Sequence, residues 1–69
     1  MTKFAAIEAR KIRRASGLSQ SEFARLIGVP IKTLQNWEQQ RTQPAGPARA
    51  LLKIVAANPK AAIQALHSA

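Results

Sequence analysis

The chain has 69 residues, enough for one small domain, because a chain of this length buries only about 60% of the surface that its unfolded form exposes. Eleven Lys and Arg residues against three acidic residues give a formal charge of +8, so a polyanion such as nucleic acid is the expected partner. There is no Cys, and the single His is His67, so we expect no disulfide, no metal and no cofactor.

Enzymatic activity and membrane insertion both lack the residues that they need. General acid or base chemistry requires a positioned His or carboxylate, and we assign the few candidates to caps, ion pairs and solvent contact, so we expect no enzyme. The longest apolar stretch, residues 51–57, contains Lys53 and is far shorter than the ~20 residues that span a bilayer. The N-terminus has no secretory signal pattern, so the cytoplasm is the expected location.

Turn signals divide the chain into five helical segments. No alternating Val, Ile, Thr and Tyr stretch predicts a strand, so the chain is predicted to be all-α. The first helix is expected from about Lys3 to Ser16, with Thr2 as its N-cap and Gly17 as a left-handed C-terminal residue. Its inward face is predicted to hold four small or apolar residues, namely Ala5, Ala9, Ile12 and Ala15.

The next two helices are expected to lie close together. A capping box in which Ser19 and Glu22 satisfy each other's backbone begins the second helix, which ends at Gly28. The third helix begins near Pro30 and extends to about Gln39. The fourth starts at Gly46-Pro47 and the fifth at Asn58-Pro59, and both are amphipathic.

The connection between the second and third helices is the most informative feature of the sequence. Only Gly28, Val29 and Pro30 separate them, and so short a connection containing Gly forces a sharp crossing. The sequence therefore predicts a helix-turn-helix over about residues 19–39. Its interior is predicted to be filled by one small and five larger apolar residues: Ala24, Phe23, Ile27, Val29, Leu34 and Trp37.

The outer face of the third helix has residue types that bind base edges. With Leu34 and Trp37 inward, helical periodicity turns Lys32, Asn36 and Gln39 outward. Thr33 and Gln35 lie on the shoulders of this face. Asn and Gln can bond adenine, Lys can bond guanine, and Thr offers a hydroxyl and a methyl. A merely solvated face is the alternative, but such faces usually carry Glu and Lys pairs, and this one has no acid.

Several of these residues together form a known pattern: Leu18-Ser19-Gln20, Ala24, Gly28-Val29, Leu34, Trp37-Glu38 and Arg41. Over about residues 3–57 the chain resembles the Cro and lambda-repressor-like (XRE) DNA-binding family. The resemblance implies a compact five-helix fold that binds a double-stranded DNA operator. It implies base contacts by Ile31, Lys32, Thr33, Gln35 and Asn36, and phosphate contacts at the start of the second helix and after the third, by Ser19, Gln20, Arg41, Thr42 and Gln43. It also implies that Gln20 braces the third helix.

The resemblance also implies an ion pair between Arg13 and Glu38 that ties the first helix to the third. Two positions depart from the family pattern. Pro30 stands where a capping Ser or Thr is usual, and Gln40 stands where Gly is usual, at a cost of roughly 1 kcal/mol if Gln40 is left-handed. Because Pro30 alters the helix start, we expect Ile31 to pack in the core or at the cap rather than to contact a thymine methyl.

The segment from Asn36 to Ala48, followed by Leu51-Leu52, is most similar to HigA-type antitoxins of toxin-antitoxin operons. Such proteins repress their own operon and neutralise an RNase toxin, so the resemblance implies an autoregulating antitoxin with an RNase toxin as its partner. A stand-alone XRE-type regulator without a toxin is the alternative that the sequence leaves open.

A homodimer is the expected assembly, because one module recognises few base pairs and two recognition helices are usually placed about one DNA turn, ~34 Å, apart. Residues 1–69 form a single domain in this interpretation, with residues 58–69 a C-terminal helix available for dimerisation. Three apolar residues are the candidate contacts: Ile54, Ile63 and Leu66. That the last helix merely covers the core is an equally good alternative.

Overall fold

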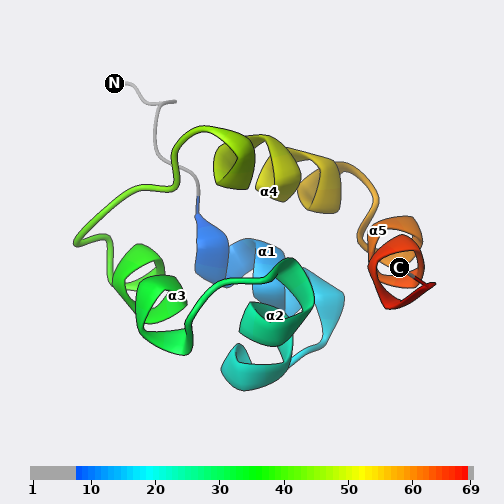
Figure 1. Ribbon diagram of the computed structural model, residues 1–69, viewed down its shortest axis with the longest axis horizontal. Helices are drawn as coiled ribbons and strands as arrows, with labels where there is room; N and C mark the ends of the chain where they lie inside the picture. Colours follow the sequence, from blue (N-terminus) through cyan, green and yellow to red (C-terminus); the bar gives the residue numbers. More distant parts are fainter. Residues whose placement is uncertain (1–7, 69) are drawn as a thin grey trace.

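The computed structural model describes residues 8–68, which fold into five helices (Figure 1). In chain order these are α1 (Ala9–Ser16), α2 (Gln20–Ile27), α3 (Ile31–Glu38), α4 (Pro47–Ala57) and α5 (Pro59–Ser68). No strand occurs among the described residues, so the all-α prediction is confirmed. Figure 1 shows α3 and α5 at opposite ends of the molecule, with α1 between them and α4 alongside.

The first helix begins at Ala9, because Glu8 has φ −91° and ψ 85° and is therefore not helical. The expected start at Lys3, the cap at Thr2 and the inward Ala5 lie outside the described residues. At the other end Gly17 has φ 77° and ends the helix in the left-handed conformation, as predicted. Ala9 is fully buried, whereas Ala15 is exposed. The inward position expected for Ala15 is wrong, because this residue lines an open groove beside α5.

The helix-turn-helix is present at the predicted place. Ser19 Oγ accepts from Glu22 N at 3.2 Å, and Ser19 N donates to Glu22 Oε1 at 3.0 Å, which completes the capping box. Gly28 ends α2 with φ 82°, and Pro30 precedes α3 with φ −61° and ψ 146°. The predicted interior is confirmed: Phe23, Ala24, Leu34 and Trp37 are buried, and Ile27 and Val29 pack partly buried against them.

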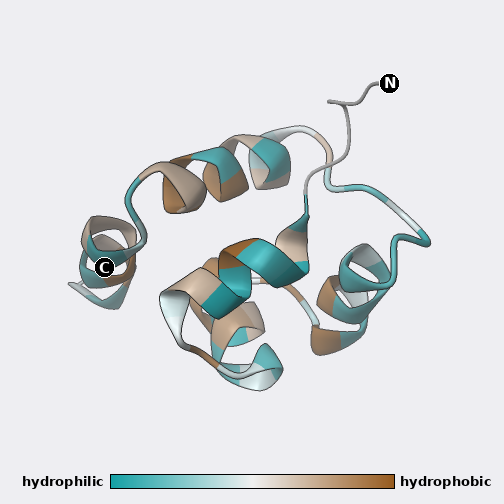
Figure 2. Cartoon of the chain, turned by 180° about the vertical axis from the view of Figure 1, so that it is seen from behind, coloured by the Kyte–Doolittle hydropathy of each residue, from teal (hydrophilic) through white to brown (hydrophobic). Residues whose placement is uncertain are grey.

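The last two helices attach to this unit through apolar side chains. Leu52 and Val55 of α4 are fully buried, and Ala62 of α5 is nearly so. Apolar and polar segments alternate along α4 in Figure 2, as an amphipathic helix requires. None of the helices described in residues 8–68 is long and apolar enough to cross a membrane.

Candidate nucleic-acid interface

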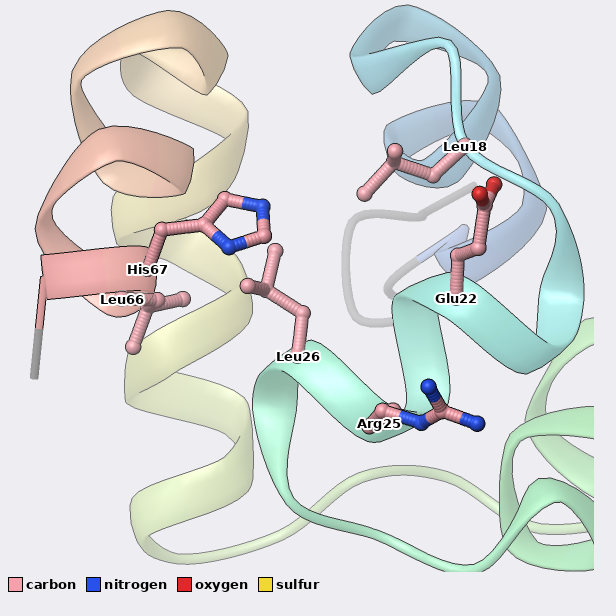
Figure 3. Close-up of a pocket in the computed structure, with 6 residues that line it drawn as sticks. All are labelled: Leu18, Glu22, Arg25, Leu26, Leu66 and His67. Atoms are coloured by element: carbon pink, nitrogen blue, oxygen red, sulfur yellow. The ribbon is translucent and has the colours of Figure 1, made fainter.

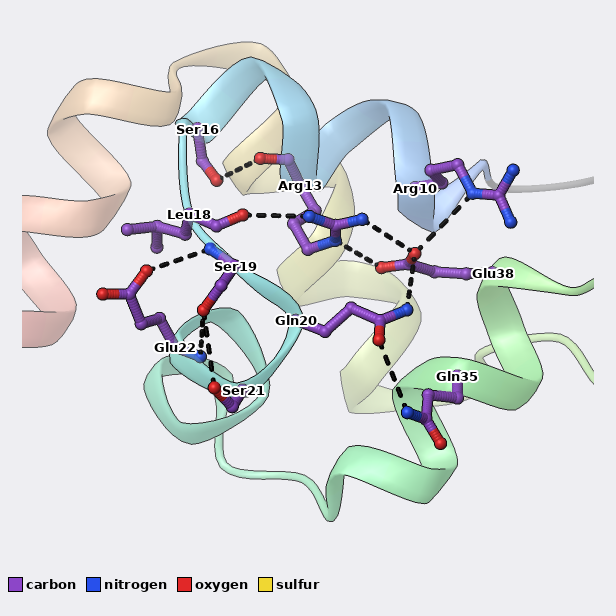
Figure 4. A network of polar contacts seen from close by, with 10 residues as sticks. All are labelled: Arg10, Arg13, Ser16, Leu18, Ser19, Gln20, Ser21, Glu22, Gln35 and Glu38. Carbon is purple, nitrogen blue, oxygen red and sulfur yellow. Dashed lines mark hydrogen bonds and ion pairs between the residues drawn. The ribbon is translucent and has the colours of Figure 1, made fainter.

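The carboxylate of Glu38, the last residue of α3, is the centre of the polar contacts near the recognition helix (Figure 4). Its side chain is only 1% exposed. Arg13 Nε donates to Glu38 Oε2 at 2.7 Å, and the second guanidinium nitrogen donates to Oε1 at 3.1 Å. The same guanidinium donates to Leu18 O at 3.0 Å. Arg13 therefore joins α1, the loop that precedes α2, and the end of α3.

Three further side chains extend this arrangement. Arg10, whose side chain is 54% exposed, brings its Nε to 3.7 Å from Glu38 Oε1. Gln20 Nε2 donates to the same oxygen at 3.1 Å, and Gln35 Nε2 approaches Gln20 Oε1 at 3.4 Å. We call these five residues the Glu38 cluster: Arg10, Arg13, Gln20, Gln35 and Glu38. The cluster connects the first turn of α2 with the middle of α3.

The protonation state of the cluster follows from its contacts. Burial raises the pKa of the Glu38 carboxyl, but the hydrogen bonds from Arg13 and Gln20 and the charges of Arg13 and Arg10 outweigh burial, so the pKa lies below its ordinary value. The hydrogen bond to Glu38 raises the pKa of Arg13. Glu38 is therefore an ionised carboxylate at neutral pH, surrounded by donors.

The resemblance implied the pair of Arg13 and Glu38 and a bracing contact of Gln20 with α3, but not the contacts of Arg10 and Gln35. Arg10 stands one helical turn before Arg13, and this spacing places both side chains on neighbouring parts of one helix surface. That spacing is the signal that could have identified Arg10. The contacts of Gln20 with Glu38 and of Gln35 with Gln20 depend on how α2 and α3 cross, so sequence spacing gave no signal for them.

The predicted base-contacting residues occupy one side of α3. Lys32 and Gln39 are exposed, whereas Thr33, Gln35 and Asn36 are half-buried. Ile31 is 42% exposed, so the expectation that it packs in the core or at the cap is wrong. Ile31 is the first residue of α3, so no preceding helical turn covers it, and the Pro30 before it makes no side-chain cap hydrogen bond.

The residues that the resemblance assigns to phosphate lie on both sides of α3. Ser19 is exposed while its hydroxyl caps α2, and Gln20 belongs to the Glu38 cluster. Beyond α3, Arg41 is exposed and its backbone N donates to Asn36 O at 2.9 Å. This bond follows the turn at Gln40, whose φ of 61° is left-handed as its replacement of a usual Gly suggested. The side chains of Thr42 and Gln43 are also exposed.

The candidate dimer residues do not share one environment. Ile54 is 61% exposed on α4, whereas Ile63 and Leu66 of α5 are half-buried. Ile63 lines the groove beside Ala15, and Leu66 lines a second groove between α2 and α5. Ile54 is the most exposed of the three candidates.

The groove between α2 and α5 has a volume of about 390 Å³ (Figure 3). It is open and mixed in character, with Glu22 and Arg25 on α2 and His67 on α5 around the side chains of Leu18, Leu26 and Leu66. Within the part of the chain that the structure describes, no three His, Asp or Glu side chains gather as metal ligands. The α3 surface therefore remains the better candidate for the functional site.

Comparison with known proteins agrees with this geometry. The helix-turn-helix family profile matches residues 10–48, which is more than half of the chain and includes α2, α3 and the Glu38 cluster. The chain belongs to the helix-turn-helix family. This assignment confirms the resemblance to XRE-type regulators and the lambda-repressor-like, all-α fold, and DNA binding is the activity of this family.

Curated relatives are similar over the same region. The chain is 45% identical over 49 residues to Antitoxin HigA-2 of Vibrio cholerae, covering 71% of this chain and 47% of the relative. It is 33% identical over 52 residues to the uncharacterized HTH-type transcriptional regulator YiaG of Escherichia coli K12, covering 75% of this chain and 54% of the relative. The chain thus spans about half the length of these relatives. No solved structure gives a significant match.

Proposed function

We propose that the protein is a sequence-specific repressor that inserts α3 into the major groove of double-stranded DNA. The observation that supports this most strongly is the charge distribution on α3. Its only carboxylate, Glu38, is buried and neutralised by Arg13, so the outer side of the helix presents Lys32 and amide side chains without an acid. Such a surface is compatible with a polyanion and with the donor and acceptor pattern of base edges.

Individual roles follow from chemistry and position. Lys32 would donate to guanine O6 and N7, Asn36 and Gln35 would bond adenine, and Thr33 would offer its hydroxyl and methyl. The exposure of Ile31 restores it as a candidate for contact with a thymine methyl. These residues would supply specificity.

Phosphate contacts would supply most of the affinity. The proposed groups are the start of α2 and the loop that follows α3, with Ser19, Gln20, Arg41, Thr42 and Gln43 as the contributing residues. Each phosphate that a cation neutralises should add about −0.9 to the slope of log affinity against log salt for B-DNA. The formal charge of +8 makes a steep salt dependence the expected result.

The decisive test is selection of bound duplexes from a random library at physiological salt. Wild type should enrich a palindromic motif, and a triple variant with Lys32→Ala, Gln35→Ala and Asn36→Ala should lose it while remaining folded by circular dichroism. No enrichment by folded wild type would contradict the proposal and would indicate that the charge binds DNA without discrimination, or that the partner is a protein.

Two single variants separate base contacts from phosphate contacts. Lys32→Ala should weaken binding to the selected motif more than binding to random DNA, because it removes a base contact. Arg41→Ala should weaken both to a similar degree and should reduce the salt slope by about one. The reverse pattern would mean that the two roles are exchanged.

We also propose that residues 1–69 act as one DNA-binding domain that forms a homodimer through the end of α4 and through α5, with Ile54, Ile63 and Leu66 as contacts. Ile54, which is 61% exposed, motivates the surface. Ile54→Lys should shift sedimentation from dimer to monomer at micromolar concentration. Ala56→Lys, an equal charge change at another exposed position of α4, is the matched control. A monomeric wild type would contradict the dimer.

The second candidate function is that of an autoregulating antitoxin, favoured by the 45% identity to HigA-2. In that case a cognate RNase toxin from the neighbouring gene should co-purify with the protein, and co-expression should restore growth that the toxin prevents. A neighbouring gene product that neither binds nor inhibits growth would favour the stand-alone regulator. We propose the cytoplasm as its location, in keeping with DNA binding in either role.

A further inference from the structure

The two arginines that face Glu38 differ in how their donors are used. The side chain of Arg13 is 17% exposed, and its three guanidinium nitrogens donate to Glu38 or to Leu18 O. The side chain of Arg10 is 54% exposed, and its Nε lies 3.7 Å from Glu38 Oε1. Figure 4 shows the two terminal nitrogens of Arg10 pointing away from the carboxylate. These two nitrogens carry most of the N–H donors of a guanidinium, so Arg10 can donate to a group outside the protein.

The charges of the cluster do not cancel. One carboxylate, that of Glu38, faces two guanidinium groups. Because Glu38 is 1% exposed and Arg13 donates to both of its oxygens, these two opposite charges compensate each other inside the protein. The charge of Arg10 is then in excess, and it lies at the surface, where it can attract an anion.

Arg10 also lies beside a group that is proposed to contact phosphate. Gln20 Nε2 and Arg10 Nε approach the same oxygen, Glu38 Oε1, at 3.1 Å and 3.7 Å. The ion pair therefore places Arg10, from α1, next to the first residue of α2. A DNA backbone that contacts the start of α2 would pass close to the exposed end of Arg10.

We infer that Arg10 is a further phosphate-contacting residue, whose Nε stays beside Glu38 while its two terminal nitrogens bind oxygens of one DNA phosphate. The inference rests on the proposed function, because the phosphate belongs to the DNA that α3 recognises. A planar guanidinium can face two anions from two of its edges, which a lysine ammonium cannot do with the same geometry. Glu38 acts as a positioning residue, because it restricts a long side chain before DNA binds and so lowers the entropy lost on binding.

The first test measures affinity for the selected motif and for random DNA at several salt concentrations. Arg10→Ala should weaken both about tenfold and reduce the salt slope by about 0.9, because a phosphate contact is independent of sequence. Lys11→Ala is the matched control. It removes the same charge from the next, equally exposed residue of α1, whose side chain leaves the helix about 100° away, so its salt slope should stay close to that of wild type. Circular dichroism checks that each variant is folded.

Arg10→Lys tests the geometry of the contact. This variant keeps the charge, so its salt slope should stay close to that of wild type. It should nevertheless bind about three- to fivefold more weakly, because an ammonium is a point charge that cannot remain beside Glu38 and present two coplanar donors to a phosphate. Arg10→Lys that binds as tightly as wild type would overturn the assignment of Glu38 as a positioning residue.

The outcomes are distinguishable. Equal effects of Arg10→Ala and Lys11→Ala would reflect only the overall charge, and they would overturn the inference while leaving the proposed function intact. Weaker binding by Arg10→Ala with an unchanged salt slope would indicate a purely structural role for Arg10, which also overturns the inference. A folded wild type that enriches no motif overturns the proposed function, and the inference with it.

Discussion

The molecule has two halves, α1 to α3 and α4 to α5, and different forces hold the helices of each half in place. Around Glu38, side chains of α1, α2 and α3 meet through an ion pair and directed hydrogen bonds. By contrast, α4 and α5 are attached through Leu52, Val55 and Ala62, which are buried among apolar neighbours. The polar side-chain bonds described at α5 are local, such as Asn58 Oδ1 accepting from Ala61 N at 3.2 Å.

The polar contacts therefore determine the orientation of α3, and the apolar contacts mainly determine the stability of the fold. Hydrogen bonds and bidentate ion pairs have geometric requirements, so they fix how α3 is presented. Apolar burial has no direction and contributes in proportion to the area removed from water. We therefore expect substitutions near Glu38 to change recognition as well as stability, and substitutions of the buried residues of α4, Leu52 and Val55, to change stability alone.

The largest expected effect is that of Arg13→Ala, which should lower the free energy of unfolding by about 3–5 kcal/mol because it leaves the Glu38 charge buried with its main partner removed. Urea unfolding at pH 7 measures this. Arg10→Ala is the matched control on the same helix, and with a side chain that is 54% exposed it should cost less than about 1 kcal/mol. Equal costs for the two variants would show that Arg13 does not support Glu38 in this way.

Leu52→Ala should cost about 2–5 kcal/mol, because Leu52 is fully buried and its truncation leaves a cavity. The remaining folded protein should still select the wild-type DNA motif. Ile54→Ala on the same helix is the control, and it should leave the unfolding free energy of the monomer within about 0.5 kcal/mol. A changed base preference in Leu52→Ala would break the separation between the two halves.

Lowering the pH should reduce the free energy of unfolding by less than these two substitutions do. The folded pKa of Glu38 is lower than its ordinary value, so its stabilising contribution is complete above that ordinary value and is lost as the pH falls through the folded pKa. Urea unfolding from pH 7 to pH 2.5 should show this loss, and Glu38→Gln should flatten it. The pKa of Glu22 is also lowered, by its hydrogen bond with the Ser19 backbone, so Glu22→Gln serves as the control.

The smallest expected effect is a gain in stability. Gln40→Gly should raise the free energy of unfolding by up to about 1 kcal/mol, because Gln40 has φ 61° and Gly adopts this conformation without steric cost. Thermal unfolding measures the gain. Gln39→Gly, at φ −88°, should give none. A destabilised Gln40→Gly would mean that the side chain of Gln40 contributes more than its backbone conformation costs.

Much of the fold could be predicted from local signals in the sequence. The capping box at Ser19 and Glu22, the left-handed Gly17 and Gly28, and the prolines that open α4 and α5 act within one or two turns of chain, so their consequences follow from sequence neighbours. The interior of the helix-turn-helix followed from helical periodicity. Misplaced residues such as Ala15 and Ile31 lie at helix ends, where exposure depends on what packs nearby.

The candidate site was predictable as a set of residues but not as an arrangement. Periodicity placed Lys32 and Asn36 on the outer side of α3 without reference to any other helix. The contacts of Gln20, Gln35 and Arg10 with one another or with Glu38 depend on the crossing of three helices, which no single segment specifies.

The sequence by itself determined the number of helices, most of their ends and the helix-turn-helix, because capping, turn geometry and periodicity act between residues close in the chain. The start of α1 at Ala9 was not among these ends. Only the tertiary structure decided that the Glu38 carboxylate accepts hydrogen bonds from two other helices, and that Gln35 contacts Gln20. Hydrogen bonds between segments depend on distances of a few tenths of an ångström, and those distances exist only once the helices have packed.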